Sequence, residues 1–379
     1  MKSTYLPRLF AFLTLLMILA CSKDTDTASD DVVGEDDTEN PLNEDPDSED
    51  PDPGDPNSED PFSVTLHSSK NAVHMILPNT ISVDDPNEFD GNAQIEVTEK
   101  VYERFKDEFD WVILVTNRED NPGFGYSGQA RSGFYNFAPN LKGIIHMPFN
   151  RAIKYGPMTH ELGHRWTPHK GLYLYSKADE ANGLHPAADG RDPLGGGTGA
   201  TLREVTVDPN DESNSTVITT TLEDGGTFEA DIFGRVANGG NSIPYNGQSM
   251  FEMGFISWDQ AGYIWVPTNA EFLRSEYTSN GGYTRFSADK IEKMSVEDFA
   301  KNELGVTQNN PVNNEQTFKI LVVLLDNETP SDAEFDLVSE HTEWLTLAGD
   351  DGNDGLFNFW EATNELGTLI SGPLDQDLK

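Results

Sequence analysis

The spacing of apolar residues predicts alternating strands and helices where the folded part of the chain begins. Between residues 62 and 78, in FSVTLHSSKNAVHMILP, apolar and polar residues alternate, which is typical of β-structure. Residues 93–117 are predicted to form a strand, then a helix, then the buried strand WVILVT. The helix is expected to carry Val101, Phe105 and Phe109 on one stripe.

The rest of the chain predicts further strands and helices that do not strictly alternate. Residues 132–149 are predicted to form two strands around a Pro-Asn turn. From Val205 to Pro267 the chain is rich in Thr, Gly and β-branched residues, which indicates loops and strands with a short helix near GQSMFEMGF. Four elements are expected after it: a helix at 296–305, a strand at 317–325, and helices near 331–347 and 356–367. This order indicates an α+β fold.

A short amphipathic helix is predicted within YGPMTHELGHRWTPHK, residues 155–170. Pro157 is suited to the first turn of a helix, and Pro168 is expected to end it about three turns later. One face of this helix carries an apolar stripe that is expected to pack on the sheet: Met158, Leu162 and Trp166.

The other face of this helix carries the pattern HExxH, formed by His160, Glu161 and His164. The two histidines are one turn apart and share a face, so their imidazoles can bind one Zn²⁺ ion. Glu161 points to one side of them and can reach a water molecule on the ion without being a ligand. Zinc lowers the pKa of that water towards about 7, and Glu161 is expected to act as its general base. A surface helix with a His/Glu/His patch is the alternative.

The segment MTHELGHRW resembles the active-site helix of the zincin metallopeptidases. The resemblance implies a zincin-like twisted sheet with the active-site helix, here with a β-rich insert and a C-terminal helical part. It also implies an edge strand before the helix that binds extended substrate by β-augmentation. Carried onto this chain, that strand contains Ser132, Gly133, Phe134 and Tyr135.

The third zinc ligand does not follow from the motif. The metzincin pattern HExxHxxGxxH is broken by Thr167 and Lys170, so this chain is not a standard metzincin. We take His185, in the loop GLHPAADG, as the third ligand, with Glu180 and Asp179 as alternatives. A loop histidine without a function remains the competing interpretation.

Two downstream residues are weaker candidates for the same site. Tyr245 could donate a hydrogen bond to the oxyanion that develops during hydrolysis. Met253 could form an apolar floor beneath the metal, as the Met-turn does in metzincins, although packing in the core is favoured.

An acidic segment near the C-terminus has some features of a calcium loop. In DDGNDGLFNFWE, Asp350, Asp354, Gly355 and Glu361 fall at positions 1, 5, 6 and 12 of an EF-hand loop. Position 3 is Gly352, which has no side-chain oxygen. An acidic turn between two helices is therefore favoured over a Ca²⁺ site.

The N-terminus has the features of an export signal followed by a tether. Residues 1–21 contain a basic start, an apolar run of about 12 residues and the lipobox-like ILAC, which indicates lipidation of Cys21, the single cysteine. A secretory signal with an incidental cysteine is the alternative. Residues 22–61 carry 17 Asp and Glu residues and one Lys, which predicts a disordered tether. Residues 62–379 are then the catalytic region.

Charge narrows the range of partners. The formal net charge is −41, which excludes nucleic acid and disfavours anionic lipid headgroups, so the membrane is contacted through the lipid anchor alone. SKDTD, after Cys21, is similar to the signals that send some Bacteroidota lipoproteins to the outer surface. We expect localisation at the outer membrane or surface of a Gram-negative bacterium.

The sequence thus predicts a lipid-anchored zinc metallopeptidase that hydrolyses extracellular protein or peptide bonds. Two alternatives stay open. One is a non-catalytic surface binding lipoprotein with a zincin-like domain, and the other is a zinc hydrolase of a non-peptide substrate. Cleavage preference and oligomeric state do not follow from the residues.

Overall fold

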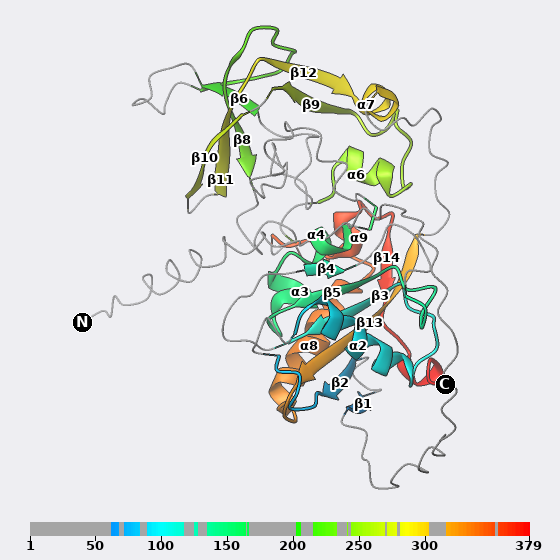
Figure 1. Ribbon diagram of the computed structural model, residues 1–379. Coiled ribbons are helices and arrows are strands. Elements are labelled where there is room, and N and C mark those ends of the chain that lie inside the picture. Colours follow the sequence, from blue (N-terminus) through cyan, green and yellow to red (C-terminus); the bar gives the residue numbers. More distant parts are fainter. Residues whose placement is uncertain are drawn as a thin grey trace, which may run out of the picture.

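In the described part of the chain, the largest sheet is mixed and has seven strands. Figure 1 shows where this sheet lies in the molecule. The computed structural model describes residues 62–67, 72–83, 89–116, 125–127, 135–163, 165–166, 202–205, 215–232, 241, 244–269, 271–278, 281–302, 316–352 and 355–379. Residues 1–61, with the signal peptide, Cys21 and the acidic tether, lie outside this range. No helix in the described residues is long and apolar enough to cross a membrane.

The strand order of this main sheet is β1-β2-β13-β3-β5-β4, and β14 pairs with β13 off this path. The central strands β2, β13, β3 and β5 are parallel, whereas β1 and β4 pair antiparallel at the two edges. The bounds are β1 (Ser63–His67), β2 (Ala72–Ile76), β3 (Trp111–Val115), β4 (Gly125–Ser127), β5 (Gly143–Met147), β13 (Thr317–Asp326) and β14 (Thr368–Ile370).

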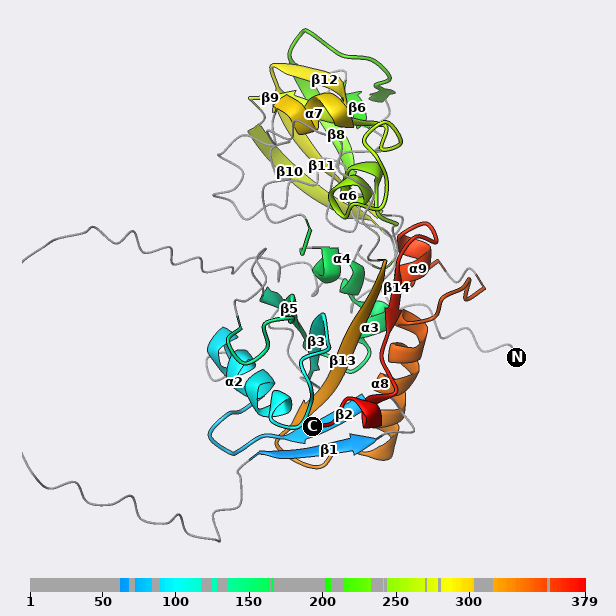
Figure 2. The same ribbon diagram turned by 90° about the vertical axis from the view of Figure 1, so that its right-hand side faces the viewer.

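Both faces of the main sheet are covered, which explains the unbroken apolar runs in its central strands. Alternate residues of β13 enter two different cores: Ile320 and Val322 face one, and Leu321 faces the other. Helix α2 (Gly91–Tyr102) covers the Leu321 face, where Val97 is buried. The Ile320 face is covered by α3 (Ala152–Tyr155), α4 (Met158–Gly163), α8 (Asp332–Leu345) and α9 (Phe359–Ala362) (Figure 2).

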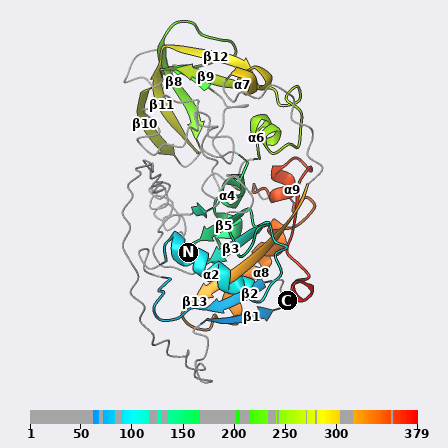
Figure 3. The same ribbon diagram turned by 45° about the vertical axis from the view of Figure 1, so that its right-hand side comes forward.

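A smaller, β-rich part lies beyond one end of the main sheet (Figure 3). Its five-stranded antiparallel sheet has the order β10-β11-β8-β6-β7, and a two-stranded sheet pairs β12 with β9. The elements are β6 (Leu202–Val205), β7 (Ser215–Val217), β8 (Gly226–Ile232), β9 (Tyr263–Thr268), β10 (Glu271–Thr278), β11 (Gly281–Ala288), β12 (Lys290–Ser295) and α7 (Val296–Asn302). The β-rich stretch predicted from Val205 to Pro267 falls in this part, which extends further along the chain, to β12 and α7.

Helix α6 (Gly247–Glu252) lies between the two parts and packs against the core of each. Met250 and Met253 pack in the core on the main sheet, and Phe251 packs in the core of the β-rich part. Asn246 caps this helix, since its side-chain oxygen accepts from Ser249 N at 2.8 Å. The short helix expected near GQSMFEMGF is confirmed, and Met253 is a core residue.

The α+β class is confirmed, and several boundaries differ from expectation. The strand predicted at the start of 93–117 is wrong, because α2 already begins at Gly91. Asp90 caps it: its Oδ1 accepts from the backbone N–H groups of Asn92 and Ala93 at 2.8 and 3.0 Å. The two phenylalanines assigned to this helix are buried but lie beyond its end, at Phe105 and Phe109.

The predicted hairpin over residues 132–149 is also only partly right. Its second strand is β5, but residues 135–142 form turns and irregular chain. The sheet edge next to β5 is occupied by β4, which lies earlier in the chain. At the C-terminal end, the helix expected over 356–367 is limited to the four residues of α9 and is followed by β14.

Candidate metal centre

The HExxH helix is α4, which is short and fixed in the main core. Met158 and Leu162 are fully buried there, and Trp166, just after the helix, packs against the same cluster. The predicted apolar stripe is therefore confirmed. Pro157 precedes the helix, and its carbonyl accepts from Glu161 N at 3.0 Å. Helix α4 contacts β4 and β5, so the motif lies against the edge of the main sheet.

The two motif side chains within the described residues are both buried. His160 and Glu161 are each 3% exposed. Burying a carboxylate and an imidazole costs free energy unless other groups or a metal compensate. Buried pairs of this kind are therefore more common at functional sites than elsewhere. The alternative of an exposed His/Glu/His patch does not fit this burial.

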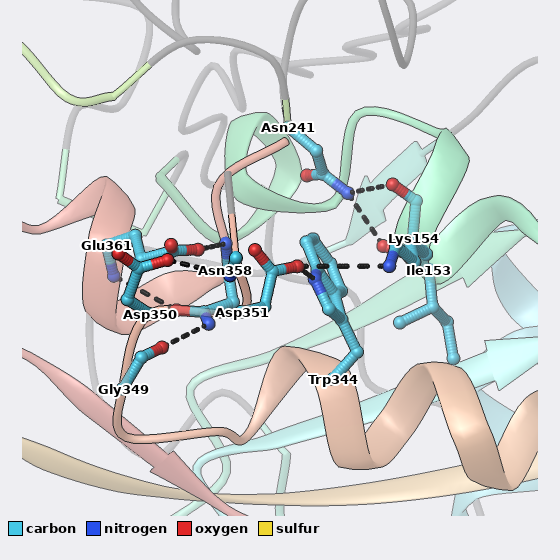
Figure 4. A network of polar contacts seen from close by, with 10 residues as sticks. Ile153, Lys154, Asn241, Trp344, Gly349, Asp350, Asp351, Asn358 and Glu361 are labelled. Atoms are coloured by element: carbon cyan, nitrogen blue, oxygen red, sulfur yellow. Dashed lines mark hydrogen bonds and ion pairs between the residues drawn. The ribbon is translucent and has the colours of Figure 1, made fainter. Parts of the chain in front are cut away.

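Asn241 joins the end of α3 to the start of α4 (Figure 4). Its Oδ1 accepts from Thr159 N at 2.8 Å, and its Nδ2 donates to the carbonyls of Ile153 and Lys154 at 2.7 and 3.0 Å. The residue is 0% exposed, and its own carbonyl accepts from Phe357 N at 2.7 Å. One side chain thus satisfies three backbone groups beside the motif. Nothing in the sequence pattern marks this residue.

Tyr245 lies directly beside the motif. Its hydroxyl donates a hydrogen bond to the carbonyl oxygen of Thr159, and the residue is 7% exposed. Its backbone N–H donates to Ala362 O at 2.9 Å, which links it to α9. The hydroxyl is therefore engaged with the helix that carries His160, and a role as an oxyanion donor stays a prediction.

The other predicted site residues fall into two groups. His164, His185, Glu180, Asp179, Ser132, Gly133 and Phe134 lie outside the described residues. Tyr135 is described, and it is 3% exposed and packs against Phe137 in the core on the α2 face. That position is on the opposite face of the main sheet from α4, so its side chain is not at an open substrate strand.

Strand β4, and not the segment with Ser132, Gly133, Phe134 and Tyr135, lies at the edge of the main sheet next to β5 in the described residues. Gly125, Tyr126 and Ser127 pair antiparallel with His146, Ile145 and Ile144 of β5. Within the described part of the chain, no further strand pairs with the other side of β4. The signal for this strand in the sequence is weak, because it has only three residues.

Comparisons of the chain with models of protein families, with curated proteins and with solved structures find no match.

Proposed function

We propose that the protein is a lipid-anchored, zinc-dependent peptidase that hydrolyses extracellular protein or peptide bonds. The observation that carries this proposal is the burial of His160 and Glu161, at 3% exposure each, on a helix whose other face is seated in the main core. A rigid element with a buried His-Glu pair is what a catalytic metal site requires.

One proposed zinc ligand, His160, lies within the described residues, and its imidazole nitrogen is a donor that suits zinc. His160 offers an imidazole nitrogen on the same helix as Glu161, and His164 with His185 would complete three protein ligands. When bound, Zn²⁺ supplies Lewis-acid polarisation of the substrate carbonyl and acidifies water. Glu161 takes the proton of the attacking water and passes it to the departing amine. Asn241 and Tyr245 hold the backbone that positions both side chains.

Strand β4 supports a peptide as the substrate. It pairs antiparallel with β5 and contacts α4, so a peptide strand added along β4 would run beside the HExxH helix. Backbone hydrogen bonds to an edge strand recognise extended peptide with little dependence on side chains. A glycan offers no matching ladder of donors and acceptors, which favours peptide over the non-peptide alternative.

The N-terminal sequence supports export and anchoring. Lipid on Cys21 would hold the chain at the membrane, and the acidic segment 22–61 would keep the folded part away from it. We place the protein at the outer membrane or cell surface of a Gram-negative bacterium, where its substrates would be extracellular proteins.

The mechanism is tested with Glu161→Gln, assayed on a peptide library beside the wild type. Loss of the general base should reduce hydrolysis by about 10²–10⁴-fold while zinc stays bound. Glu340→Gln, an exposed residue of α8, is the matched control and should retain activity. Equal activity in Glu161→Gln and wild type would exclude the mechanism. A wild type that binds zinc but cleaves no peptide would instead favour a binding lipoprotein.

Tyr245→Phe in the same assay separates two roles for that hydroxyl. If the hydroxyl is an oxyanion donor, its removal should lower kcat by about 10²-fold or more. If it only holds the Thr159 carbonyl, its removal should lower the free energy of unfolding by about 1 kcal/mol and leave kcat within a few-fold of wild type.

A further inference from the structure

Three carboxylates meet in the turn between α8 and α9, apart from the HExxH helix. Asp350, Asp351 and Glu361 each place an oxygen within 4.8 Å of the other two (Figure 4). Among the described residues, this is the only cluster of three or more His, Cys, Asp and Glu side chains with the spacing of a metal site. Acidic clusters are common on protein surfaces, so the grouping alone does not define a site.

A second observation distinguishes this cluster from an ordinary acidic surface. The side chain of Asp351 is 9% exposed. Its Oδ2 accepts from Trp344 Nε1 at 2.5 Å and lies 3.9 Å from Lys154 Nζ. Its Oδ1 is buried, and no donor in the described residues reaches it. In Figure 4 this oxygen is on the side of the carboxylate that faces Asp350 and Glu361. A buried carboxylate oxygen without a partner costs free energy, and a cation would remove that cost.

The turn also holds the carboxylates in place before any ion binds. Asp350 Oδ1 accepts from Gly352 N at 2.8 Å, and Glu361 Oε2 accepts from Asn358 N at 2.9 Å. Asn358 is fully buried, and its Nδ2 donates to the carbonyl of Gly349 at 3.0 Å. The three side chains are thus oriented by separate donors, so little ordering is left for an ion to impose.

The charges of the cluster are unbalanced. Three carboxylates and the ammonium of Lys154 leave a net charge of about −2, which one divalent cation would neutralise.

We propose that Asp350, Asp351 and Glu361 bind one Ca²⁺ ion. All three donors are carboxylate oxygens, which suit a hard cation such as Ca²⁺ and not the nitrogen-rich coordination of zinc. Three oxygens that are all 4.8 Å apart would lie about 2.8 Å from their common centre, which is nearer to the roughly 2.3–2.6 Å of Ca²⁺ ligands than to the roughly 2.0–2.1 Å that Mg²⁺ requires. Water molecules complete the coordination.

This arrangement is not the EF-hand that the sequence spacing suggested. The helix that follows the turn, α9, has only four residues. The third carboxylate of the cluster, beside those of Asp350 and Glu361, belongs to Asp351, a position that the EF-hand spacing does not use. Asp354, which that spacing did use, lies outside the described residues. The calcium proposal does not depend on zinc binding or on peptidase activity at α4.

The test is a calorimetric titration of the full chain with CaCl₂, after zinc loading and removal of free metal. We expect one Ca²⁺ site with a Kd on the order of 0.1–1 mM, as in extracellular modules, and weaker binding of MgCl₂. In Asp350→Asn/Glu361→Gln, calcium affinity should fall at least tenfold while zinc content is unchanged. Both substitutions keep side-chain size and retain an amide oxygen for the backbone donors.

The control carries Glu340→Gln and Asp375→Asn, two exposed positions away from the turn, so it loses the same charge. It should bind calcium as the wild type does, and weak binding to the acidic tether cancels in this comparison. If the double variant fails to fold, judged by circular dichroism, Asp350→Asn alone should weaken binding several-fold, since Asp350 is exposed. Equal affinity in the turn variants and the control, or no saturable uptake by the wild type, would overturn the proposal.

Discussion

The HExxH helix and the acidic turn are both candidate metal sites, but they differ in donors and burial. Helix α4 presents an imidazole and a carboxylate that are each 3% exposed. The turn presents three carboxylates, of which Asp350 is exposed. Nitrogen donors on a buried helix suit zinc, and oxygen donors on a partly exposed turn suit calcium. The proposed zinc and calcium ions would therefore not compete for the same donors.

The two sites are also held in place by different kinds of contact. The backbone at Thr159 is bonded by Asn241, 82 residues later, and by Tyr245, 86 residues later. The turn is held mainly by neighbours in the chain, as in the reciprocal capping of Asn358 and Glu361. The HExxH helix therefore depends on the whole fold, whereas the turn is largely organised locally.

The difference between long-range and local support can be tested at Asn241. Asn241→Ala removes two buried hydrogen bonds and one partly buried hydrogen bond, and should lower the free energy of unfolding by about 3 kcal/mol, as measured by urea denaturation. Asn140→Ala is the matched control: its side chain donates to Asp107 O at 2.9 Å at an exposed position, so a loss of about 0.5 kcal/mol is expected. Similar losses in both variants would contradict a special role for Asn241.

A smaller change in the free energy of unfolding is expected when the pH is varied, because Glu361 in the acidic turn is titrated. The pKa of Glu361 is raised above its usual 4.5 in the folded chain, chiefly by burial, so the folded state holds this proton more tightly. The resulting stability is present below pH 4.5 and is lost as the pH rises through the raised pKa. In calcium-free buffer, the wild type should therefore lose stability relative to Glu361→Gln as the pH increases from 4 to 7. A constant difference between the two chains across this range would be evidence against strain at the cluster.

Much of the fold could be predicted because local patterns determine it. The apolar runs TFKILVVLL and WVILV became β13 and β3, buried on both faces. The strand predicted at the start of residues 93–117 is wrong because the cap of α2, Asp90, lies just before that segment. The apolar residues Ala93, Val97 and Val101 in fact repeat at helical spacing.

Fewer residues of the candidate sites than of the fold could be predicted from the sequence. His160 and Glu161 could be identified from the motif alone, since the chemistry needs those residue types at that spacing. Asn241 could not, because a single asparagine has no periodic signal and its partners become close only when the chain folds back. In the acidic turn, spacing pointed to Asp354, whereas the folded chain turns Asp351 towards Glu361 and Trp344.

The central claim, that α4 carries a zinc site, is tested most directly by the zinc content of the purified chain. We predict one zinc ion per wild-type chain and its loss in His160→Ala. His67→Ala, which replaces a partly exposed histidine of β1, should keep the ion. His185→Ala in the same series tests the third ligand. A wild type without zinc, or a full equivalent of zinc retained by His160→Ala, would contradict the account.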